Sequence, residues 1–163
     1  GCMIGPADAA FDEWARISLQ VDGPLTQVGV YADAGAGRWV FIGADADGAD
    51  RVSAKIRALG RFAVMKDGTP PAIAHVLPET GSVVDADVEF SARVTDNGAG
   101  IKQEQDVILE LDGVPLIAEY DPEADRVTAT ADLPLTAGAH HLAVTVRDAV
   151  GNESVATADF ISR

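Results

Sequence analysis

Two polar, glycine-rich clusters each follow a strand-like run, and their side chains are of the types that bind calcium. The first is Asp96-Asn97-Gly98-Ala99-Gly100, and the second runs from Asp148 to Asn152. Ca²⁺ takes about six to eight oxygens, so the candidate calcium ligands are Asp67, Asp96, Asn97, Asp148 and Asn152. Alternatively, these side chains accept hydrogen bonds from their own turns, and the glycines supply positive φ. The turn interpretation suffices for all five residues, and we favour it.

Aromatic side chains in the first part of the chain form a second candidate site. Trp39 and Phe41 fall on one face of a predicted strand, and Tyr31 is expected to be their cross-strand neighbour. Such rings could stack on a glycan or on peptidoglycan. Aromatic residues in a small domain more often pack in its core, which is the competing expectation for all three.

Histidines offer little for a metal. His75, His140 and His141 are the three in the chain, and zinc needs three or four clustered ligands. His140 and His141 are adjacent, so they point to opposite faces of a strand and cannot easily share an ion. We expect His140 or His75 to lie on the surface.

The sequence does not predict catalysis. It lacks the G-x-S-x-G elbow of α/β-hydrolases, and Cys2 has no evident histidine partner. Pairs of acidic residues are expected in any protein of this charge. We assign no catalytic residue and predict that the chain is not an enzyme, with any catalytic domain elsewhere in a longer parent protein.

The net charge of the chain limits the classes of partner that it can bind. The formal charge of −14 and the lack of a Lys/Arg cluster exclude nucleic acid and anionic membranes as expected partners. No apolar run has the length of a membrane span.

Cys2 is the single cysteine, so no intrachain disulfide can form. It is either an accidental thiol or the lipid-bearing residue of a mature lipoprotein. The chain reads as a piece of something longer.

Short alternating runs fill the first part of the chain. Five are predicted strands: ARISLQV, QVGVYA, RWVFIGA, RVSAKI and GRFAVM. Ile17, Leu19 and Val21 are expected on one face, and only AFDEWA could form a helical turn. Turns such as Asp47-Gly48 separate the runs. The spacing predicts a small β-sandwich or barrel over residues 1–66.

Residues 67–71 are predicted to be a linker, because Pro70-Pro71 cannot donate to a ladder and stiffens the backbone. Its shortness implies a fixed angle between neighbours. Residues 72–163 have the length of a seven-strand immunoglobulin-like sandwich, and the whole chain is predicted to be all-β with two small domains. The predicted strands are AIAHVL, DVEFSARVT, DVILELDG, VPLIAEY, RVTATADLP, HHLAVTVRD and VATADFIS. The expected inward-facing residues are Val88, Phe90, Ala92, Val94, Val107, Leu109, Leu111, Leu142, Val144, Val146 and Phe160.

The motifs of the second part carry a resemblance. The segments DGTPPAI, VTDNGAGI, LELDGVPL and LTAGAHHLAVTVRDAVGNES make residues 68–163 similar to the bacterial immunoglobulin-like, fibronectin-like repeats of secreted and cell-surface proteins. In that fold the loop after the second strand and the loop before the last strand lie at one end. The resemblance therefore implies that Asp96 and Asp148 are neighbours, close to Asp67.

The first part resembles a short strand-rich module that often precedes such repeats, on the segments IGPADAAFDEWARISL, GVYADAGAGRWVFIGADAD and VSAKIRALGRFAVMKD. The pairing is similar to the non-catalytic C-terminal region of bacterial envelope proteins, including lysostaphin-type metallopeptidases. The resemblance implies an accessory or spacer segment, outside the cell or in its envelope, whose partners are the neighbouring domains of its parent chain. The rival hypothesis is a module that binds cell-wall glycan or a surface protein. No cofactor is expected apart from the calcium alternative.

Overall fold

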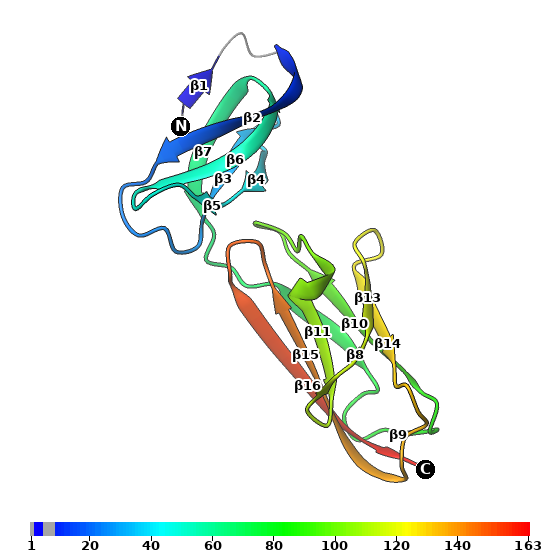
Figure 1. Ribbon diagram of the computed structural model, residues 1–163. Helices are drawn as coiled ribbons and strands as arrows, with labels where there is room; N and C mark the ends of the chain where they lie inside the picture. Colours follow the sequence, from blue (N-terminus) through cyan, green and yellow to red (C-terminus); the bar gives the residue numbers. More distant parts are fainter. Residues whose placement is uncertain (1, 5–8) are drawn as a thin grey trace. The chain divides into compact units, whose positions relative to one another are not determined.

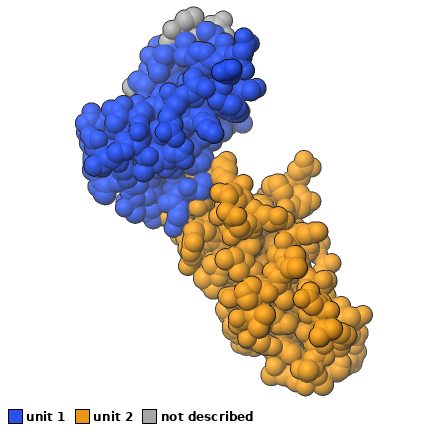
Figure 2. Space-filling view, in the orientation of Figure 1, with its two compact units in different colours: residues 1–69, 149–151 blue, residues 70–148, 152–163 orange. Residues whose placement is uncertain are grey.

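The computed structural model describes residues 2–4 and 9–163, and the chain is all-β (Figure 1). It forms two compact units, coloured separately in Figure 2. Unit 1 comprises residues 1–69 with 149–151, and unit 2 comprises residues 70–148 with 152–163. Each unit is a small β-sandwich with its own hydrophobic core. Among the described residues, no helix has the length and apolar character that crossing a membrane requires.

Unit 1 pairs a four-stranded sheet with a three-stranded sheet, both antiparallel. The first has the order β1 (Cys2–Ile4), β7 (Gly60–Lys66), β3 (Val28–Asp33) and β4 (Trp39–Gly43). The second has the order β2 (Ala10–Gln20), β6 (Arg51–Ala58) and β5 (Asp45–Ala46). The buried core residues are Ile17, Val21, Val28, Val30, Val52, Ala54, Ile56 and Phe62. All five predicted runs form or contribute to strands, and the predicted face of Ile17, Leu19 and Val21 packs in this core, with Leu19 partly buried.

The prediction of a helical turn at AFDEWA is wrong, because these residues belong to strand β2. The pairing of β2 with β6 is irregular between Ala10 and Ala15, and this register shift interrupts the period-two pattern. Phe11 and Ala15 pack against the core, whereas Trp14 is exposed beneath the guanidinium of Arg57. Residues 5–8, which contribute to the resemblance of the first part, lie outside the described residues.

Unit 2 has two facing sheets. One has the order β13 (Ala118–Asp121), β14 (Arg126–Thr130), β10 (Glu89–Thr95) and β8 (Ala72–Leu77). The other has the order β12 (Val114–Pro115), β11 (Val107–Leu111), β15 (Gly138–Arg147), β16 (Glu153–Ser162) and β9 (Val83–Val84). A 3₁₀ turn, η1 (Glu104–Asp106), precedes β11. The residues predicted to face inward all belong to the core, Val88 as a partly buried member.

At two places in unit 2 the chain passes from one sheet to the other, which the sequence did not predict. The predicted strand VPLIAEY forms β12 in one sheet and β13 in the other, with Leu116 and Ile117 between them. Similarly, β8 ends before Pro78, which has no N–H to donate, and β9 then pairs in parallel with β16 in the opposite sheet. The Asp112-Gly113 hairpin between β11 and β12 is confirmed, with positive φ at both residues.

Candidate functional site

Asp96, in the loop after β10, and Asp148, directly after β15, lie close together in unit 2, as the resemblance to immunoglobulin-like repeats implied. A carboxylate oxygen of Asp96 and one of Asp148 lie within 4.8 Å of each other. Asp148 and Asn152 are buried, Asp96 is half-buried, and Asn97 is exposed. The expectation that Asp96 and Asp148 are neighbours is therefore confirmed.

The carboxylates of these loops support their own turns. Asp96 Oδ2 accepts hydrogen bonds from the N–H groups of Gly98 at 3.1 Å and Gly100 at 2.5 Å. Asp148 Oδ1 accepts from the N–H of Asn152 at 2.8 Å, and its Oδ2 accepts from the Asn152 side-chain amide at 2.6 Å. These are the local bonds of Asx-type turns. Asp96 Oδ2 and both carboxylate oxygens of Asp148 therefore accept hydrogen bonds within their own loops.

Asp67 behaves in the same way within unit 1. Its N–H donates to the carbonyl of Gln27 at 2.8 Å, and its Oδ1 accepts from the N–H of Thr69 at 3.0 Å. The side chain thereby fixes the chain direction just after β7.

The aromatic residues of the second candidate site do not share one environment. Tyr31 and Phe41 are buried cross-strand partners whose rings meet edge to face at 5.4 Å. The Phe41 ring lies over Gly29, where an added Cβ would come within 2.5 Å of it. Trp39 is half-buried and pairs with Asp33. Two of the three rings are therefore packed away from solvent, and Trp39 is the one that reaches it.

Trp39 borders a hollow of about 400 Å³ in unit 1. The residues that line it are Cys2, Met3, Trp39, Arg61, Phe62 and Ala63. Arg61 forms an ion pair with Asp33 at 3.3 Å, next to the indole on the same sheet face. An indole beside a paired guanidinium and carboxylate offers a stacking face and polar groups for hydroxyls.

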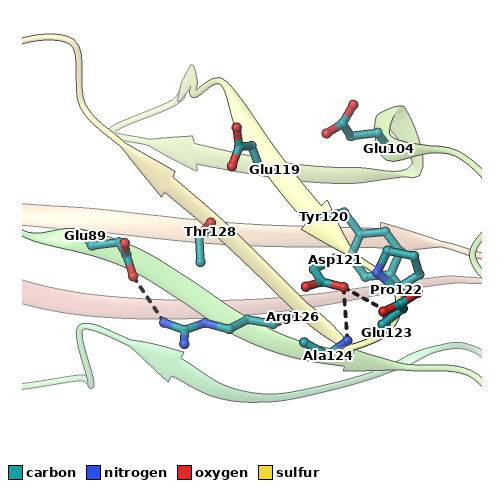
Figure 3. Close-up of a pocket in the computed structure, with 10 residues that line it drawn as sticks. All are labelled: Glu89, Glu104, Glu119, Tyr120, Asp121, Pro122, Glu123, Ala124, Arg126 and Thr128. Atoms are coloured by element: carbon teal, nitrogen blue, oxygen red, sulfur yellow. Dashed lines mark hydrogen bonds and ion pairs between the residues drawn. The ribbon is translucent and has the colours of Figure 1, made fainter.

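Sequence reasoning missed an acidic hollow on the outer face of β13, β14 and β10 in unit 2, of about 710 Å³ (Figure 3). Its lining residues are Glu89, Glu104, Glu119, Tyr120, Asp121, Pro122, Glu123, Ala124, Arg126 and Thr128. Glu119, Asp121 and Glu123 come from one run at and after β13, whereas Glu89 and Glu104 come from β10 and η1. The run of alternating acidic residues was visible in the sequence, but its distant partners were not. Their excess over the one arginine makes the hollow electronegative.

Several polar groups of this hollow are held by neighbours. Arg126 pairs with Glu89 at 3.1 Å, and Asp121 Oδ1 accepts hydrogen bonds from the N–H groups of Glu123 and Ala124, as Figure 3 shows. The pKa of Tyr120 is raised, first by burial and then by nearby carboxylates such as Asp125 and Asp121. A phenol with a raised pKa stays neutral and does not act as a base near neutral pH.

The expectation that His140 or His75 lies on the surface is met by His75, which is exposed. His140 is buried. His140 continues the inward alternation of Leu142 and Val144 along β15, so its side chain must point into the sandwich. His141 is exposed on the opposite face, as predicted.

In sequence, no protein-family model and no curated protein matches the chain. In structure, the fibronectin(III)-like modules of CbhA from Clostridium thermocellum match with a TM-score of 0.47 and 14% identity, over 99% of this chain and 93% of that one. CopC from Methylosinus trichosporium OB3b matches with a TM-score of 0.45 and 15% identity, over 56% of this chain and 92% of that one. Dimeric latent PorU from Porphyromonas gingivalis matches with a TM-score of 0.44 and 16% identity, over 92% of this chain and 20% of that one. Because these scores lie below 0.5, the fold assignment rests on the strand pairing within this chain.

Proposed function

We propose that the chain is a non-catalytic accessory segment of a larger secreted or cell-envelope bacterial protein, and that it sets the spacing between the parts on either side of it. A position C-terminal to a peptidase domain, as in lysostaphin-type metallopeptidases, fits the resemblance of its motifs. The neighbouring domains of the parent chain are then its partners.

One observation carries the proposal: side chains that could do chemistry are used to hold turns and hairpins. The Asp96 and Asp148 carboxylates accept hydrogen bonds from their own loops. Asp121, in the acidic hollow, does the same for the turn after β13. Each of these carboxylates has a structural task in its own turn, which accounts for its presence without a reacting group or an ion.

The linker between β7 and β8 supports the spacer role. We take residues 67–71 as this linker, in which Pro70 and Pro71 have fixed φ angles. Its C-terminal end is anchored, because the Ser154 hydroxyl on β16 donates to the carbonyl of Pro71 at 2.6 Å. A short segment with restricted dihedrals and an anchored end transmits spacing better than a flexible one.

Pulsed electron paramagnetic resonance tests the linker. Spin labels would be placed on exposed strand positions, at Lys55→Cys in unit 1 and Thr157→Cys in unit 2, in a Cys2→Ser background. The proposal expects a narrow distance distribution that broadens when Pro70 and Pro71 are both replaced by glycine. A label pair within unit 2, at Thr130 and Thr157, is the control and should be unaffected. An equally broad distribution with and without the two prolines would refute the spacer role.

A second candidate function is glycan binding, and the half-buried Trp39 favours it. The indole borders the hollow near the Arg61–Asp33 ion pair, although Tyr31 and Phe41 are buried. An NMR titration with soluble peptidoglycan fragments tests this function. Binding would shift the Trp39 indole signal and be lost in Trp39→Ala, while the exposed Trp14 provides the control signal.

A further inference from the structure

His140 lies at the start of β15 and joins three segments of unit 2. Its imidazole Nδ1 is 2.7 Å from Asp112 Oδ2, in the turn between β11 and β12. Its Nε2 is 2.8 Å from the carbonyl oxygen of Thr136, in the connection between β14 and β15. The ring is also stacked on Phe160 of β16, with centroids 5.6 Å apart.

The two contacts of the ring fix its protonation state. A carboxylate and a backbone carbonyl are both acceptors, so each ring nitrogen must carry a proton to make its hydrogen bond. Neutral imidazole has one N–H and one lone pair, and in that form one contact becomes a repulsion between lone pairs. The arrangement is therefore complete only with the imidazolium.

Each charged group near the His140 ring has a defined partner. Asp112 is the carboxylate that faces His140, and its other oxygen accepts the N–H of His141 at 2.8 Å. On β16, Phe160 presents an apolar ring, while Asp159 faces the His141 side chain at 2.7 Å. The His140 side chain is 8% exposed, so water cannot easily replace either contact.

We propose that His140 is a pH-sensitive clamp, which holds the connection of residues 131–137 and the β11–β12 turn against β15 while its ring is charged, and releases one of them when the ring loses a proton. In immunoglobulin sandwiches a tyrosine hydroxyl at the corner before the penultimate strand bonds to the backbone upstream. Here a histidine at the corresponding corner makes the hydrogen bond to the backbone, and its side chain can change charge near neutral pH.

The pKa directions agree with the geometry. The hydrogen bond to Asp112, followed by the one to Thr136, raises the pKa of His140 above 6.5 although burial opposes the shift. Burial alone would raise the pKa of Asp112, but the hydrogen bonds from His140 and His141 and their charges lower it below 3.8. The histidine's contribution to stability is therefore complete below pH 6.5 and is lost as pH rises through its raised pKa. That of Asp112 is complete above pH 3.8 and is lost as pH falls through its lowered pKa.

An NMR titration of the full chain, from about pH 5 to about pH 10, tests the clamp, because ordinary histidines titrate near pH 6.5. The imidazole ¹⁵N shifts report the midpoint for each histidine. We expect His140 to titrate above 6.5. Asp112→Asn should lower that midpoint by about one pH unit, the scale of an opposite charge in contact. The backbone amides of residues 136–138 should move with the same midpoint.

The matched control is His141→Gln, which removes the adjacent, exposed histidine and its own aspartate contact. It should leave the titration of His140 and of the 136–138 amides unchanged, whereas His140→Gln should abolish the amide response. The proposal is overturned if His140 of the unmodified chain titrates at or below 6.5, or if the 136–138 amides do not follow it. The unmodified chain alone decides this, so a variant that fails to fold leaves the test intact.

Discussion

Replacing Asp148 by alanine should destabilise unit 2 far more than the same replacement at Asp121. Both carboxylates accept two N–H hydrogen bonds at the end of a turn. They differ in burial, because Asp148 is 4% exposed and its donor residue Asn152 is 3% exposed, whereas Asp121 is exposed. Each substitution removes one negative charge and two accepted hydrogen bonds, so burial is the main difference between the two sites.

The size of the expected loss in stability depends on whether the N–H donors find another acceptor after the substitution. After Asp148→Ala, the N–H and the side-chain amide of Asn152 are left buried without this acceptor, and a buried hydrogen bond to a charged group is worth about 1.5–3 kcal/mol. We expect a loss of about 3 kcal/mol in the free energy of unfolding. After Asp121→Ala, water replaces the carboxylate, and the loss should stay below about 1 kcal/mol.

Urea unfolding with residue-resolved NMR is the suitable assay. Both tryptophans, Trp14 and Trp39, belong to unit 1, so indole fluorescence reports that unit, while amide signals report unit 2. A loss of 3 kcal/mol in a domain of this size also lowers the melting temperature by roughly 12–24 °C. The reasoning is refuted if Asp148→Ala costs no more than Asp121→Ala.

Two further predictions concern packing and calcium. Gly29→Ala should destabilise unit 1 by about 1–3 kcal/mol through overpacking, because the new Cβ would meet the Phe41 ring, whereas Gly60→Ala, with open space around it, is the control in urea unfolding and should be nearly neutral. Millimolar CaCl₂ should leave the melting temperature of unit 2 unchanged in calorimetry, because the Asp148 oxygens already accept hydrogen bonds. Binding at a hundredfold excess over the dissociation constant would instead add about 2.7 kcal/mol and contradict this expectation.

The sandwich cores were predictable from sequence because burial on one face imposes a period of two. Phe90, Ala92 and Val94 show this along β10, and all three are buried. The pattern fails where pairing is irregular, as in β2, and where the chain crosses between sheets, as between β12 and β13. Those features depend on contacts with distant strands, which a local pattern does not record.

The candidate site was predictable to a similar extent. The meeting of the Asp96 and Asp148 loops follows from the immunoglobulin-like strand order that the resemblance implied. The pairing of His140 with Asp112 depends on the register of β11 against β15, in which Leu111 pairs with Leu142. The signal for a buried His140 was present, since it alternates with Leu142. What the sequence could not supply was the partner, which is 28 residues away.

Sedimentation with purified bacterial cell walls tests the central claim, an accessory spacer as opposed to a binding module, most directly. Our account predicts that the chain stays in the supernatant to the same extent as an unrelated acidic protein. The contrary result is a chain that pellets with the walls and returns to the supernatant in Trp39→Ala, with Trp14→Ala as the matched control. That outcome would establish a binding module and contradict the proposed function.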